Sequence, residues 1–207
     1  MSLGRVKKDI ERYLNERAYN LLNIPNGNRT IEIRERERAD LRRVKIFIDN
    51  NFKIENVVEF NTDPRQFLNL MKNQRNCDYN FIIEDINGKT FCFLVELKTT
   101  IYDDDLTEDD KIKGQIKSIF IYIYMLSKFL DLSPEFRAIV FYKNDKRSKT
   151  VPPTEIDPYI QRETDIGVSG GYWDFKLPKN KLKTIKFALV KADNDQTFNL
   201  SYLATLP

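Results

Sequence analysis

The amino-acid sequence predicts an α/β protein in which helices flank one mixed β-sheet. Apolar residues recur at helical spacing in residues 5–22 and again in residues 107–130. Short apolar runs bounded by turn residues lie between and after these segments, as expected for strands. The order along the chain is therefore helix, strand, hairpin, helix, strand and then a tail rich in strands, which is typical of an α/β sandwich.

The first third of the chain is expected to be largely helical. A helix over residues 5–22 carries a broad apolar stripe, and Asn26-Gly27-Asn28 forms a turn. A second helix is predicted over residues 35–51. Its apolar positions at helical spacing are Leu41, Val44, Ile48 and Phe52. A short strand at 55–60 follows, and Asp63-Pro64 is typical of the start of a short helix.

The rest of the chain is expected to alternate strands with one long helix. Residues 78–99 form a predicted hairpin, and Thr107 with Asp110 resembles the capping box of a helix that continues to about Leu130. Residues 136–142 read as a buried strand. Further strands are expected at 172–177, 184–191 and 197–203.

Length and composition indicate a single globular domain. With 207 residues, 41% hydrophobic and 31% charged, the chain suits one full core and not a disordered segment. We expect the core at about 35–142, a helical extension over 1–34 and a β-rich extension over 143–207. No apolar run approaches the roughly 18 residues that span a bilayer, and the first residues are too polar for a signal peptide. A cytoplasmic location without membrane contact is therefore expected.

Residue types narrow the chemistry. The chain has no histidine, which excludes Ser-His-Asp and Cys-His triads and nearly every zinc enzyme site. A bound metal would need oxygen ligands, which favours magnesium, manganese or calcium. Cys77 and Cys92 fall in predicted strands and are expected to be buried thiols. The net charge of +3 does not by itself indicate a nucleic-acid-binding protein.

The predicted hairpin carries three charged residues at the end away from its turn. Asp78 opens the first apolar run, and the second run ends in Glu96-Leu97-Lys98. A two-residue turn at Asn87-Gly88 would place Asp78 opposite Leu97, so that Glu96 and Lys98 would point to the other face. That register would separate the charged groups.

A three-residue loop gives the opposite result. If Ile86-Asn87-Gly88 form the loop with Gly88 in the left-handed region, Asp85 pairs with Lys89 and Asp78 lies directly across from Glu96. The same register pairs Asn80 with Leu94 and Ile82 with Cys92. We predict this register, which brings the charged side chains to one face.

Two adjacent carboxylates and an amine suit phosphodiester hydrolysis. Asp78 and Glu96 would repel each other unless a cation lay between them, and such a pair suits Mg²⁺, for which Mn²⁺ can substitute. The backbone carbonyl of Leu97 is a further candidate ligand. Lys98 would orient or deprotonate the attacking water, or stabilise negative charge on the phosphate. The alternative is a surface salt bridge between Lys98 and one of the acids.

The pattern Asp78 … Glu96-x-Lys98, on a hairpin followed by a long helix, resembles the PD-(D/E)xK nuclease superfamily. This group includes restriction endonucleases, archaeal Holliday junction resolvases and RecB-like exonucleases. The resemblance covers about residues 35–142 and implies a restriction-endonuclease-like core of helix, three strands, helix and strand. It implies that Asp78 and Glu96 bind the metal and that Lys98 is catalytic. Cys77 stands where the motif name has proline.

The resemblance also implies further site residues. Many members carry a glutamine on the following helix, and Gln115 fits, although a core glutamine bonded to the backbone is an equal alternative. Gln115 shares a helical stripe with apolar residues, so it is expected to face the sheet. Many members add one more acid from the first core helix. The sequence leaves three choices open for it, namely Glu16, Glu35 and Glu37.

Basic residues offer two sets of nucleic-acid contacts. Lys111, Lys113 and Lys117 flank Gln115 and are well placed for phosphates. A second set lies on one face of the predicted second helix, unless that helix is simply solvated with local ion pairs. This set is Arg38, Arg42 and Lys45. A basic loop beyond residue 142, from Lys143 to Lys149, is either a DNA-binding loop or an ordinary soluble loop.

These observations predict a Mg²⁺-dependent nuclease that cleaves DNA, most simply as an endonuclease. A nuclease acting on RNA is one alternative, because nothing in the sequence separates the two substrates. A nuclease-fold protein that binds DNA or a partner without cutting is another. A homodimer would suit double-strand cleavage, but no dimer surface is visible in the sequence.

Overall fold

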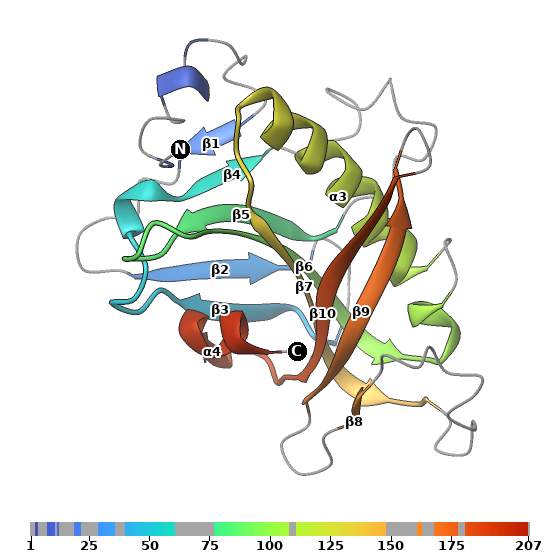
Figure 1. Ribbon diagram of the computed structural model, residues 1–207. Coiled ribbons are helices and arrows are strands. Elements are labelled where there is room, and N and C mark those ends of the chain that lie inside the picture. Colours follow the sequence, from blue (N-terminus) through green and yellow to red (C-terminus); the bar gives the residue numbers. More distant parts are fainter. Residues whose placement is uncertain are drawn as a thin grey trace.

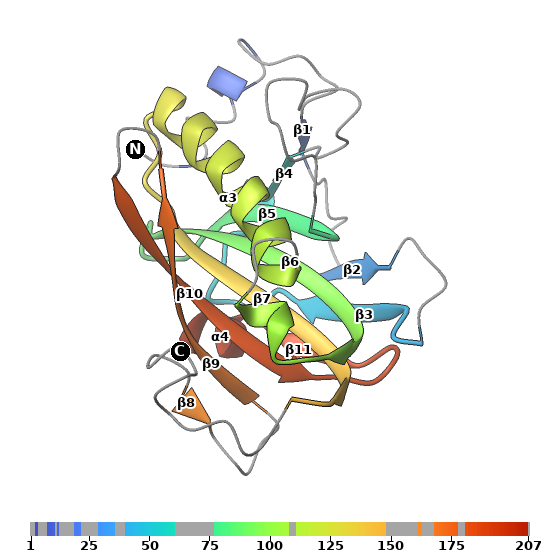
Figure 2. The ribbon, with the colours of Figure 1, turned by 90° about the vertical axis from the view of Figure 1, so that its right-hand side faces the viewer.

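The computed structural model describes residues 3, 8–10, 12, 19–21, 29–35, 40–60, 77–107, 111–147, 161–162, 168–177 and 181–206. These residues form a mixed α/β structure that is richer in strands than in helices. Eight strands build one large mixed sheet, in the spatial order β1-β4-β5-β6-β7-β10-β9-β8, and three build a small one, β11-β3-β2 (Figures 1 and 2).

The strands and helices have the following bounds in the structure. In the large sheet they are β1 Tyr19–Leu21, β4 Val58–Phe60, β5 Tyr79–Glu84, β6 Thr90–Ile101, β7 Glu135–Asp145, β8 Gln161–Arg162, β9 Val168–Lys176 and β10 Leu182–Lys191. In the small sheet they are β2 Thr30–Arg34, β3 Arg43–Phe47 and β11 Thr197–Asn199. The helices are α3 Ile112–Phe129 and α4 Leu200–Thr205, with the short 3₁₀ segments η2 Ile54–Asn56 and η3 Asp104–Leu106.

The centre of the large sheet combines a meander with a crossover. Strands β4, β5 and β6 are antiparallel neighbours, whereas β7 runs parallel to β6 and follows it through α3. Parallel strands need such a crossover, and here α3 supplies it. Strand β10 continues the sheet parallel to β7, and β9 returns antiparallel to β10. The C-terminal strands therefore belong to the same sheet as the predicted hairpin.

Both faces of the large sheet are covered. Helix α3 packs on one face, and the small sheet with α4 packs on the other (Figures 1 and 2). Strand β6 shows the division, because Cys92 and Leu94 face the α3 side while Phe93 and Val95 face the small sheet. Burial on both faces explains why β6 reads as a continuous apolar run and not as an alternating one.

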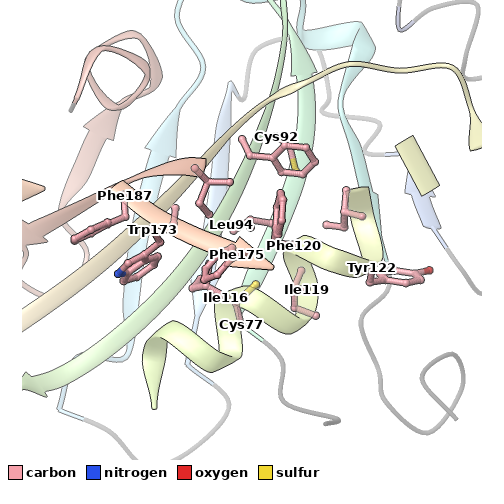
Figure 3. Close-up of a cluster of buried hydrophobic side chains, with 14 of the residues drawn as sticks. Cys77, Cys92, Leu94, Ile116, Ile119, Phe120, Tyr122, Trp173, Phe175 and Phe187 are labelled. Atoms are coloured by element: carbon pink, nitrogen blue, oxygen red, sulfur yellow. The ribbon is translucent and has the colours of Figure 1, made fainter. Parts of the chain in front are cut away.

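The α3 layer is anchored by aromatic side chains (Figure 3). Trp173 is 1% exposed, stacks on Phe187 with ring centroids 4.1 Å apart, and donates its indole N–H to the carbonyl oxygen of Leu106 at 3.1 Å. Phe120 of α3 lies 5.4 Å from Phe175 of β9. Trp173 therefore packs the C-terminal strands against the core and the segment that precedes α3.

Several sequence predictions are confirmed. The hairpin, the long helix, the strand at β7 and the two C-terminal strands β9 and β10 all occur. Cys77 and Cys92 are buried free thiols, as expected. In the part of the chain that is described, no helix has the length and apolar character that crossing a membrane requires.

The helix predicted over residues 35–51 is wrong. Strand β3 occupies Arg43–Phe47 and pairs with β2 in an antiparallel ladder that joins Ile31 to Ile46. Val44 and Ile46 are buried while the intervening Lys45 is not, which is the period of a strand. Apolar spacing fitted both periods here, and pairing between strands decided in favour of β structure.

Three further expectations need correction. Residues 8–10 and 12 are helical, but Tyr19–Leu21, inside the expected first helix, pairs with β4 as a strand. Helix α3 begins at Ile112, after the expected capping box, and Thr107 ends η3 instead. The last expected strand stops at Asn199, whose side chain accepts a hydrogen bond from the backbone N–H of Ser201 and so caps α4. The expected short helix at 63–64 lies outside the described residues.

Candidate active site at the open end of the β5–β6 hairpin

The loop of the hairpin has the predicted three-residue form. The backbone N–H of Asp85 donates to the carbonyl of Lys89 at 2.8 Å, and the N–H of Gly88 donates to the carbonyl of Asp85 at 3.1 Å. Gly88 has φ +83°, in the left-handed region that glycine adopts without a steric penalty. The Asp85 carboxylate accepts further bonds from the N–H groups of Asn87 and Lys89. Local turn chemistry therefore sets the register.

The predicted register is confirmed along the ladder. Asn80 pairs with Leu94 and Ile82 with Cys92, as the three-residue loop requires. Beyond the last pair, side chains continue the connection between the two strands. The N–H of Asp78 donates to Oε2 of Glu96 at 3.2 Å, and the N–H of Leu97 donates to Oδ2 of Asp78 at 2.6 Å.

Lys98 completes the group on the α3 side of the sheet. Its Nζ lies 2.6 Å from Oε1 of Glu96. Glu96 and Lys98 are separated by one residue, so both project to the face of β6 that also carries Leu94. The Glu96 side chain is 1% exposed and that of Lys98 is 30% exposed. The structure thus brings Asp78, Glu96 and Lys98 together, with a buried acid beside a partly accessible amine.

Burial and charge strongly perturb this group. Burial raises the pKa of Glu96 to about 8, and the negative charge of Asp78 adds to the increase, while the ammonium of Lys98 opposes it. Burial alone would lower the pKa of Lys98, but the charge and hydrogen bond of Glu96 raise it overall. The lysine is therefore held as an ammonium, able to donate protons in hydrogen bonds.

Glu35 is the third acid that acts on this group. Its charge raises the pKa of both Glu96 and Lys98. It directly follows β2, and its backbone N–H donates to the carbonyl of Arg42 at 3.0 Å. The sequence left the choice open between Glu16, Glu35 and Glu37; the other two lie outside the described residues. Glu35 comes from the small sheet and not from a helix.

The donor atoms fit a hard divalent cation. Asp78 and Glu96 offer carboxylate oxygens, and a half-buried acid beside a buried one is repelled by it unless a positive charge is added. The N–H of Leu97 points to Asp78, and the N–H and C=O of a strand residue face the same neighbour, so the Leu97 carbonyl faces this side too. In the part of the chain that the structure describes, no group of three or more acidic or cysteine side chains is arranged to hold a metal ion.

The remaining predicted residues are placed less closely. Gln115 is half-buried in the first turn of α3, and among the described residues no hydrogen bond joins it to Asp78, Glu96 or Lys98. Lys111 pairs with Asp104 at 3.5 Å. Lys113 and Lys117 are half-buried positions of the same helix.

The basic face predicted for Arg38, Arg42 and Lys45 does not exist in helical form. Arg38 lies outside the described residues, Arg42 precedes β3, and Lys45 lies within it, 3.7 Å from Asp195. Helical spacing of these cations is lost because β3 pairs with β2. Arg42 instead joins a different set of side chains.

An open groove lies beside Glu35. Its volume is ≈ 580 Å³, and charged side chains form most of its wall. The lining residues are Arg34, Glu35, Asp40, Arg42, Arg43, Lys143, Asn194 and Asp195. Sequence reasoning missed most of them, because Asn194 meets Arg42 only through tertiary contacts. Lys143 was predicted to belong to a basic loop, but it lies within β7.

Comparison with protein-family models, with curated proteins and with solved structures finds no match to this chain. Its site is therefore interpreted from its own geometry.

Proposed function

We propose that this chain is a metal-dependent nuclease that hydrolyses phosphodiester bonds in DNA, acting as an endonuclease of restriction-endonuclease-like fold. The observation that carries the proposal is the buried carboxylate of Glu96 at the open end of a hairpin, which lies 2.6 Å from Nζ of Lys98 and accepts the backbone N–H of the half-buried Asp78. A purely structural ion pair gains little from a second acid beside the buried one, whereas a catalytic metal centre requires both.

The order of elements around the site supports the proposed fold. Three antiparallel strands, a helix and a parallel strand follow one another from β4 to β7. This matches the last five elements of the core that the resemblance implies. The chain departs from that core before β4, where strands β2 and β3 stand in place of the expected first helix.

The roles of the residues follow from their positions. Asp78, Glu96 and the Leu97 carbonyl would hold Mg²⁺, or Mn²⁺ in its place, which supplies charge neutralisation and a more acidic bound water. Glu96, with its raised pKa, is ionised most readily when positive charge is nearby. Lys98 as an ammonium donates to the attacking water or to a phosphate oxygen.

A specific observation favours one competing function. The carboxylates of Asp78 and Glu96 accept backbone N–H groups where the β5–β6 ladder ends, so they also close the hairpin. In that alternative the protein binds DNA or a partner on the same fold without cutting it. An RNA nuclease would use the same residues, and the substrate test separates these cases.

The test is a cleavage assay on four substrates. Supercoiled, linear duplex and single-stranded DNA and a single-stranded RNA are incubated with Mg²⁺ or Mn²⁺. We expect metal-dependent cleavage of DNA that falls by about 100-fold or more in Asp78→Asn and Lys98→Met, because each removes a group acting in the reaction. Glu84→Gln is the control, since Glu84 is as buried as Glu96 and lies at the other end of the same hairpin.

Two results would contradict the proposal. Absence of cleavage on every substrate by folded wild-type protein would favour the binding alternative, and equal loss in Glu84→Gln would show that the losses reflect folding. Cleavage confined to RNA would retain the chemistry and change the substrate. Concentration dependence of duplex cleavage would test whether a homodimer forms.

A further inference from the structure

We propose that the groove beside the site binds the phosphodiester backbone of the nucleic acid, next to the bond to be cleaved. The inference rests on the proposed function, because it names the surface on which that function's substrate lies. The cations that would contact phosphates are Arg34, Arg42, Arg43 and Lys143. None of them lies on α3, where the sequence placed the best candidates.

The groove is a built surface whose wall is held from two sides. The side-chain oxygen of Asn194 accepts the N–H of Arg42 at 2.6 Å, and its amide donates to the carbonyl of Asp40 at 2.6 Å. On the other side, the N–H of Asp40 donates to Oγ1 of Thr99 at 3.0 Å. The segment at 40–42 is thus tied both to the turn after β10 and to β6.

Glu35 is the link between the groove and the candidate active site. Side chains alternate along β6 and β7, so Thr99 and Lys143 project to the small-sheet face of the large sheet, whereas Lys98 and its partner Tyr142 project to the α3 face. Glu35 belongs to both regions, since it lines the groove and its charge acts on Glu96 and Lys98. A backbone lying in the groove would have to pass Glu35, from the small-sheet face towards the α3 face, to reach Lys98.

The ion pairs of the groove orient its arginines without using up their donors. Arg43 forms ion pairs with Asp195 and, at 3.7 Å, with Glu32, and Arg34 also pairs with Glu32. A guanidinium has five N–H donors, so an arginine held by a carboxylate can still donate to a phosphate oxygen. Exposed carboxylate partners also exchange readily, because surface ion pairs are worth at most about 1 kcal/mol.

The shape of the groove favours a chain of phosphates over a single anion. A site for one phosphate needs several donors converging on one point in an enclosed pocket. Here four cations line an open groove together with Glu35, Asp40 and Asp195. Such a surface matches a ligand with repeated charges, whose counterions are released as each cation takes a phosphate.

The test measures where nucleic acid binds, independently of cleavage. Fluorescence anisotropy with labelled duplex DNA, single-stranded DNA and RNA of equal length is recorded in EDTA, over a range of salt concentrations. The variants are Arg42→Glu, Lys143→Glu and their combination, with the milder Arg42→Gln and Lys143→Gln in case charge reversal prevents folding. The control is Lys183→Glu, which changes an exposed lysine at the start of β10. It lies about 25 Å along that strand from Lys191, the end of β10 that leads to the groove residue Asn194.

We expect the Arg42/Lys143 double variants to lose about tenfold or more in affinity, and the salt dependence to fall by roughly one unit of log–log slope per lost phosphate contact. Lys183→Glu should stay within about twofold of wild type. Equal losses of affinity in the control, unchanged affinity in the double variants, or no binding by wild type would each overturn the proposal that the groove binds nucleic acid. If wild type cleaves DNA and the groove variants bind it with unchanged affinity, only the groove proposal fails. If binding depends on the groove but no substrate is cleaved, only the proposed nuclease function fails.

Discussion

Replacement of Glu96 by glutamine tests the electrostatics of the site through stability alone. The side chain is 1% exposed, and its pKa is raised from the ordinary 4.5 to about 8. Glutamine keeps the size and one oxygen but cannot ionise. Glu96→Gln therefore removes a buried charge without opening a cavity, and its effect on the free energy of unfolding must depend on pH.

The sign follows from proton binding. A group whose pKa is raised by folding binds protons more strongly in the folded state, so its contribution to stability is complete at low pH and is lost as pH rises. For Glu96 the loss extends from about pH 4.5 to about pH 8. Since one pKa unit corresponds to about 1.4 kcal/mol, the total is at most about 5 kcal/mol, of which about 2–3 kcal/mol falls between pH 5.5 and 7.5.

Glu84 supplies a control of opposite sign. It is also 1% exposed, but the ammonium of Lys53 and the N–H of Leu3 hold its pKa below the ordinary value even though burial alone would raise it. Its contribution to stability is present above its ordinary pKa and is lost only as pH falls below that range. Glu84→Gln should therefore be destabilised by a constant amount between pH 5.5 and 7.5.

Thermal or denaturant unfolding in EDTA measures both variants against wild type. We expect the free energy of unfolding of Glu96→Gln, relative to that of wild type, to rise by about 2–3 kcal/mol as the pH is raised from 5.5 to 7.5. For a chain of this size, this corresponds to about 4–12 °C in Tm. A difference that is flat with pH, or that favours wild type more as pH rises, would refute the electrostatic account. The same pH dependence in Glu84→Gln would assign it to the protein as a whole.

Two further predictions concern metal binding at the site and the turn of the hairpin. Mg²⁺ should raise Tm more at pH 8.5 than at pH 6, because it competes with the proton on Glu96. This increase should vanish in Asp78→Asn, and an equal increase in that variant would contradict metal binding there. Gly88→Val should lower the free energy of unfolding by about 1–2 kcal/mol in denaturant unfolding, because φ is +83° at Gly88. Asn87→Val should lower it less, and equal losses would contradict the argument from backbone strain.

The hairpin could be predicted from sequence because its determinants are local. Asp85 and Gly88 lie within the loop and select its length, and the side-chain period of two then assigns every later residue to a face. Asp78, Glu96 and Lys98 meet as a direct consequence of that count. The long helix after the hairpin could also be predicted from the sequence, because its apolar stripe extends over several turns.

The small sheet could not be predicted, because its stability comes from partners far away in the chain. β3 lies between β2 and β11, with Ile46 opposite Phe198 in the second pairing. The apolar residues at 41–52 fit a helix and a strand alike. A strand forms where neighbours complete its hydrogen bonds, and those neighbours are fixed only when the whole chain folds.

The sequence by itself determined which reactive groups lie at the open end of the hairpin. These are two acids and a lysine on one face, and the chain contains no histidine. Tertiary structure alone decided which other residues surround them. It brought Glu35 to the pair from the small sheet, and it joined Arg42 to Asn194, 152 residues later. Short-range turn geometry sets the first kind of contact, whereas the second depends on how covered sheet faces pack.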